Sequence, residues 1–95
     1  MRIESGSSGG GQISNTNDKV LSIIFHARSK NGGSAYVGGD SVAVGDGYEL
    51  VQDATLAPDF SLLGADPNAG HVLLSSFYTV TEVSGDKVDW LAILR

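Results

Sequence analysis

Two histidines and numerous serines carry the side chains that nucleophilic catalysis would use. A hydrolytic triad needs a serine, a histidine that takes its proton and a carboxylate that orients the ring. His26 falls in an alternating stretch typical of a strand, His71 follows a glycine in a loop, and no serine stands in a nucleophile-elbow pattern. We therefore predict no catalytic residue and expect the chain not to be an enzyme.

Acidic residues are the second group of side chains that could support catalysis or bind a metal ion. Asp40, Asp46 and Glu49 surround a glycine-rich loop, and Asp86 and Asp89 flank a turn. Carboxylates beside glycines are also ordinary turn residues, because their oxygens accept hydrogen bonds from the backbone. The loop lacks the EF-hand spacing, so calcium there stays an alternative. With no cysteine and two separated histidines, we predict no metal site and no cofactor.

The charge distribution excludes one class of partner. The net charge is −5, and between Asn31 and Asp86 there are eight acidic residues and no lysine or arginine. Nucleic-acid binders need basic surface to neutralise phosphates, and anionic membranes attract the same residues. We predict that the chain binds neither. No apolar run approaches the roughly 20 residues of a membrane span, and the start of the chain does not resemble a signal peptide.

Hydrophobic alternation predicts strands. Between residues 19 and 28, Leu21, Ile23, Phe25 and Ala27 are expected to face a core. Further short strand candidates, separated by turns, are 34–38, 41–44, 48–51, 54–58, 72–74, 77–83 and 87–94. The longest irregular stretch, 59–70, is expected to be a loop with at most one helical turn. The turns at 30–33 and 84–86 are expected to close two hairpins.

The fold class predicted from this pattern is all-β: a small antiparallel β-sandwich or barrel of six to seven short strands. A single domain is expected at residues 19–95. Residues 1–18 contain the low-complexity tract SGSSGGG, which is also typical of an artificial linker. We expect an extended Gly/Ser-rich arm, flexible or clasping a partner, whose removal leaves the domain folded.

The last strand carries apolar residues on both faces, more than a lone small domain needs to bury. Trp90 and its alternate neighbours are expected in the core, which leaves Leu91 and Ile93 on the other face. Ile24 and Phe77 likewise fall on expected outer faces, with Tyr78 directed to the core. Either the 59–70 loop or another protein must cover them. We predict that Ile24, Phe77, Leu91 and Ile93 form a protein interface.

Four short motifs occur in a recognisable order. They are Asn31-Gly-Gly-Ser-Ala-Tyr-Val-Gly38 after a strand ending in arginine, Gly47-Tyr-Glu-Leu50, Tyr78-Thr-Val80 and Gly85-Asp-Lys-Val88. Their order over residues 19–95 resembles that of small virion proteins of tailed phages. The chain departs from that pattern where Val51-Gln-Asp53 replaces a Pro-Gly step and where residues 59–74 are longer.

The resemblance implies a non-enzymatic structural protein that decorates or cements a capsid at the virion surface. The implied partners are the major capsid protein or another virion protein, and other copies of the chain, as a trimer. An alternative from a different class is a head-fibre or tail accessory module that recognises a host-surface glycan. That alternative needs an aromatic side chain exposed beside polar groups, for which Tyr36 and Tyr48 are candidates.

Overall fold

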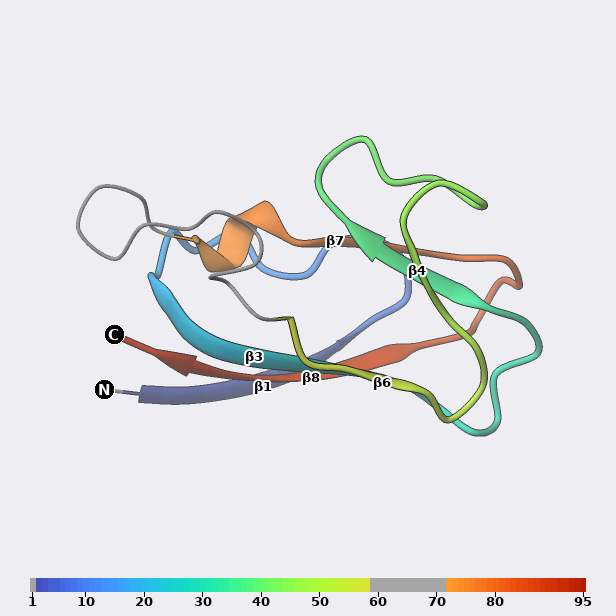
Figure 1. The fold of residues 1–95 in the computed structure, drawn as a ribbon, viewed down its shortest axis with the longest axis horizontal. Helices are drawn as coiled ribbons and strands as arrows, with labels where there is room; N and C mark the ends of the chain where they lie inside the picture. Colours follow the sequence, from blue (N-terminus) through green and yellow to red (C-terminus); the bar gives the residue numbers. More distant parts are fainter. Residues whose placement is uncertain (1, 59–71) are drawn as a thin grey trace.

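The computed structural model describes residues 2–58 and 72–95, and the fold over them is all-β (Figure 1). The predicted 59–70 loop, its helical turn and His71 lie outside the described residues. The strands are β1 (Arg2–Ser8), β2 (Gly11–Gln12), β3 (Val20–Ala27), β4 (Ala35–Gly38), β5 (Tyr48–Leu50), β6 (Thr55–Leu56), β7 (Tyr78–Thr81) and β8 (Val88–Leu94). The first sheet has the order β1-β8-β3-β6 and the second sheet the order β2-β7-β4-β5. Every pairing is antiparallel.

One hydrophobic core is shared by the two sheets. β8 supplies one side of it, as the sequence predicts, because its alternate residues from Val88 to Leu94 are buried. From β3, Ile23, Phe25 and Ala27 are buried as expected. Leu21 is the exception: the pairing of β3 with β8 shifts register between Val20 and Ser22. This irregularity turns Val20 inward and leaves Leu21 exposed, so the prediction for Leu21 is wrong.

β7 presents the opposite face to the core from the one expected. Thr79 is buried, whereas Tyr78 is only half-buried. Phe77, just before the strand, lies in the core with its ring centroid 5.3 Å from that of Phe25. The expectation that Phe77 faces outward is therefore wrong, and this residue drops out of the predicted interface. Alternation alone does not decide which of two mixed faces is buried, because both offer apolar residues.

Both predicted hairpins are wrong for a common reason. β3 and β4 follow each other in the chain, but β3 belongs to the first sheet and β4 to the second. β7 and β8 are separated in the same way. Each connection crosses from one layer to the other at the same end of the molecule (Figure 1). Turn residues favour a reversal of the chain, but they do not decide which sheet receives the next strand.

Asn31 and Asp86 join these two crossing connections. The Asn31 side chain donates to the carbonyl oxygen of Lys87 (2.9 Å) and accepts from the backbone N–H of Lys87 (3.0 Å). The Asp86 carboxylate accepts from the backbone N–H groups of Gly32 (2.9 Å) and Gly33 (3.0 Å). Both side chains are buried. The hydrogen bonds compensate the cost of burying these polar groups, so their role is structural.

The segment predicted to be an arm contributes a strand to each sheet. β1 runs beside β8 from Arg2, opposite Leu94, to Ser8, opposite Val88. β2 pairs with β7. Residues 2–12 are therefore part of the folded unit, and the expected boundary at residue 18 is wrong. The backbone finds its hydrogen bonds in β8 and β7, which overrides the low strand propensity of glycine and serine.

Small side chains in this segment fit the core beneath it. Gly6 lies on the indole of Trp90, and a Cβ atom at Gly6 would stand 3.0 Å from three of its ring atoms. Ser8 is buried, and its hydroxyl lies 2.8 Å from that of Thr79 on β7. This contact links the first sheet to the second. A larger residue at position 6 would separate β1 from the core.

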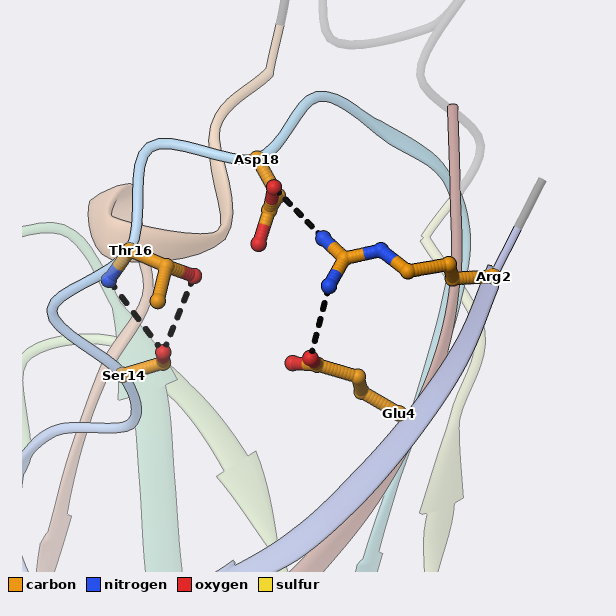
Figure 2. Close-up of polar contacts among 5 residues, drawn as sticks. All are labelled: Arg2, Glu4, Ser14, Thr16 and Asp18. Carbon is orange, nitrogen blue, oxygen red and sulfur yellow. Dashed lines mark hydrogen bonds and ion pairs between the residues drawn. The ribbon is translucent and has the colours of Figure 1, made fainter.

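The connection between β2 and β3 is joined to β1 by one ion pair. Figure 2 shows Arg2 reaching from β1 toward Asp18, with 2.6 Å between Nη2 and Oδ1. The other guanidinium nitrogen lies 3.2 Å from the Glu4 carboxylate. Within the connection, the Ser14 hydroxyl accepts from the backbone N–H of Thr16 (3.3 Å). The Arg2–Asp18 pair therefore places the end of this connection beside the start of β1.

Candidate functional site

His26 does not lie in a catalytic arrangement within residues 2–58 and 72–95. Its Nε2 lies 2.9 Å from Oδ1 of Asp53, and both side chains are exposed. Asp53 has a φ of 66°, in the left-handed region that aspartate tolerates better than most residues. In the described part of the chain, no hydrogen bond joins His26 to a hydroxyl group. A histidine and a carboxylate without a nucleophile form a surface pair rather than a triad.

The carboxylates considered for calcium are not gathered into a site. Across the described ranges, no group of three or more histidines, cysteines or acids could hold a metal ion. Glu49 lies beside Tyr36, whose hydroxyl is 3.5 Å from the carboxylate. Burial raises the pKa of Tyr36, and the negative charge of Glu49 adds to the effect. Asp46 instead closes a turn with Ala43 through backbone hydrogen bonds (2.8 and 3.0 Å).

The outer face of the first sheet brings together three of the predicted interface residues. Ile24 on β3 lies opposite Leu91 on β8, and both side chains are exposed, at 40% and 43%. Ile93 is half-buried two residues farther along β8. Ile3 on β1 lies opposite Ile93 and is 68% exposed. Residues directly opposite on antiparallel strands share a face. We call Ile3, Ile24, Leu91 and Ile93 the outer patch.

Ile3 is the member of the outer patch that sequence reasoning missed. It stands in the segment read as an arm, whose low-complexity tract begins only at Ser5. The isolated pattern Arg-Ile-Glu, with an apolar residue between two charged ones, is the only signal of an edge strand there. The structure supplies the missing partner, since β8 aligns Ile3 with Ile93.

One charged pair, Arg28–Asp89, borders the outer patch. The Arg28 guanidinium makes two hydrogen bonds to the Asp89 carboxylate, at 2.9 and 2.8 Å. These bonds hold the pKa of Asp89 below its usual value and raise the pKa of Arg28. A depression of about 140 Å³ lies between this border and the patch, and it is lined by Ile24, His26, Asp89, Trp90 and Leu91. An apolar centre with a polar rim is the usual anatomy of a protein-binding surface.

The two tyrosines considered for sugar binding, together with Trp90 and Tyr78, lie in three environments. Trp90 and Tyr36 are buried, which leaves neither ring available to a ligand. Tyr48 is 60% exposed on the edge strand β5. Tyr78 is half-buried and lines a groove of about 370 Å³ together with Gly39, Asp40, Ser75 and Ser76. The expectation that Tyr78 points into the core is wrong, and the groove was not predicted.

Comparison with known proteins gives no family assignment: no family model, no curated protein and no solved structure matches the chain. Among the residues that the structure describes, no helix has the length and apolar character to cross a membrane.

Proposed function

We propose that this chain is a non-enzymatic phage structural protein, a capsid decoration or cement protein at the virion surface. The observation that carries the proposal is the outer patch, an apolar surface bordered by the Arg28–Asp89 pair on a small acidic domain. The order of sequence motifs that resembles small phage virion proteins supports it. The two sheets sharing one core support a β-sandwich as the form of the domain.

The proposed partner is the major capsid protein, with the outer patch as the contact. A fully buried aliphatic side chain contributes about 1.5–3 kcal/mol, and the members of the patch are already partly covered, so one copy gains less. Repetition on a lattice makes such contacts effective, because neighbouring attachments act together. The trimer implied by the resemblance would add contacts between copies.

The test is attachment to capsids of the phage that encodes the chain, prepared without this protein. The full chain is added back, and the bound fraction is measured by co-sedimentation and located by electron microscopy. We expect density on the head, and we expect Leu91→Lys to lower the bound fraction at least tenfold, because it places a charge in the apolar contact.

Val51→Lys is the matched control, since Val51 is an exposed apolar residue outside the outer patch. It should bind as the unmodified chain does. Density on the tail alone would support the tail accessory alternative. Absence of the protein from virions, or equal binding by the Leu91→Lys variant, would contradict the proposal.

A further inference from the structure

The groove on the second sheet is separate from the outer patch and is formed by different elements. It is lined by Tyr78 on β7, by Gly39 and Asp40 at the start of the β4–β5 connection, and by Ser75 and Ser76 of the 3-10 turn η1 (Leu74–Ser76). Figure 1 shows η1 at the end of the chain segment that leads into β7, and the β4–β5 connection beside β7. A volume of about 370 Å³ is within the range of small-molecule clefts.

The neighbours of Tyr78 in the sheet explain why this residue lines the groove. Its neighbours across the strands are Gln12 and Gly38. Gly38 has no side chain to cover the ring, and part of the space beside it is taken by Val42, which would stand 3.2 Å from a Cβ atom there. Gln12 is drawn to η1, because its side-chain amide donates to the carbonyl oxygen of Ser75 (2.7 Å).

The residues that line the groove carry polar groups of two kinds. The Ser75 hydroxyl is held by Asn17, at 2.7 Å from its Oδ1. Asp40 and Ser76 are exposed, and within the described residues the Asp40 carboxylate makes no hydrogen bond or ion pair. From the residues that the structure describes, the groove therefore offers one tyrosine, one negatively charged acceptor and two hydroxyls.

We propose that this groove binds a neutral sugar. The apolar C–H face of a pyranose packs on an aromatic ring, which Tyr78 supplies. A carboxylate accepts hydrogen bonds from two adjacent sugar hydroxyls, which is the role of Asp40. The hydroxyls of Ser75 and Ser76 complete the polar contacts. This is the site at which a glycan-recognising module would bind its ligand, and it does not depend on attachment through the outer patch.

Charge and shape select against other ligands of similar size. From Asn31 to Asp86 the chain has no lysine or arginine, so nothing in the groove lining neutralises an acidic sugar or a phosphate. A quaternary ammonium ion is usually enclosed by several aromatic walls. Among the described residues that line this groove, one is aromatic. A neutral hexose or N-acetylhexosamine satisfies the aromatic surface and the acceptor without adding charge.

The test is a titration of the full chain, labelled with ¹⁵N, with methyl glycosides of glucose, galactose, mannose and N-acetylglucosamine. We expect at least one of these sugars to cause saturable shifts that centre on the amides of Asp40, Ser75 and Tyr78. Asp40→Asn should weaken binding about tenfold by removing the charged acceptor. Tyr78→Ala should weaken it by at least as much, with folding checked from the spectrum.

Asp46→Asn and Tyr48→Ala are the matched controls, because they change an exposed acid and an exposed ring outside the groove lining. Both should bind like the unmodified chain. The inference is overturned if none of the four sugars gives saturable shifts, if Asp40→Asn binds unchanged, or if N-acetylneuraminic acid binds as tightly as the neutral sugars. Leu91→Lys should retain sugar binding, which separates this result from capsid attachment.

Discussion

At the scale of single residues, burial decides which polar groups serve the fold and which remain available. Asp86 is buried and accepts two backbone N–H groups, so its carboxylate is fully used. Asp89 is about 41% exposed and paired with Arg28 at the border of the outer patch. Asp40 is exposed beside the groove and has no partner within the described residues. The same side chain therefore has three roles in one small domain.

The Asp89–Arg28 pair should give a small pH dependence in acid. The hydrogen bonds from Arg28 lower the pKa of Asp89 in the folded chain below its unfolded value. A lowered pKa adds stability above the unfolded value of about 4, and that stability is lost as the pH falls through the folded value. Because both side chains are 40–50% exposed, solvent screens the pair and its contribution to stability is small.

The measurement is the melting temperature of the unmodified chain and of Asp89→Asn between pH 2 and 7. The two melting temperatures should differ near neutral pH and converge below about pH 4. Asp46→Asn serves as the comparison, since Asp46 is exposed and outside any ion pair of the described residues. A constant difference between unmodified chain and Asp89→Asn across the range would contradict the assignment.

At the scale of elements, β1 shows that a neighbouring strand can override composition. Its sequence, RIESGSS, has weak strand propensity, but it pairs with β8 over its full length. The alternation within it is meaningful: Ile3 joins the outer patch, while Gly6 faces inward against Trp90. The edge strand of the first sheet thus contributes one apolar residue to the outer face and a glycine where the indole needs room.

Gly6→Val should destabilise the domain by about 1–3 kcal/mol, because the new side chain overlaps the Trp90 indole. Ser5→Val is the matched control: it places the same valine side chain at the preceding position, which is exposed on the other face of β1. Urea unfolding followed by tryptophan fluorescence measures both. Equal midpoints for the two variants would show that Gly6 does not pack on Trp90 as described.

At the scale of the whole molecule, the N-terminal segment of the chain completes both sheets. Residues 2–12 add one strand to each sheet, and the buried Ser8–Thr79 contact connects the two. The segment therefore completes the core. Outside that core the molecule presents two different surfaces, an apolar patch on the first sheet and a polar groove on the second.

Removal of residues 1–12 should therefore abolish the cooperative unfolding transition or shift it to much lower denaturant. The truncation uncovers Trp90 and Thr79, which are buried in the full chain, and leaves β8 and β7 as sheet edges. Circular dichroism and a urea titration of residues 13–95 provide the test. A truncated chain as stable as the full one would restore the idea of a separable arm.

Sequence reasoning predicts those features of this protein that depend on residues close together in the chain. Alternation on β8 identifies Val88, Trp90 and Leu94 as core, and the same alternation assigns Leu91 to the opposite face. The positions of the central strands and their turns follow from β-branched and aromatic residues bounded by glycines. Each of these assignments depends on neighbours in the chain, so the sequence alone is sufficient.

What the sequence by itself determined is an acidic, all-β chain of short strands with an apolar surplus on its last strand. Only the tertiary structure decided which strands pair, because a turn reverses the chain without choosing the sheet that receives it. It alone turned Phe77 inward, brought Ile3 to Ile93, and assembled Asp40, Ser75 and Tyr78 around one groove. The physical reason is that pairing and burial join residues far apart in sequence, and local alternation carries no information about such partners.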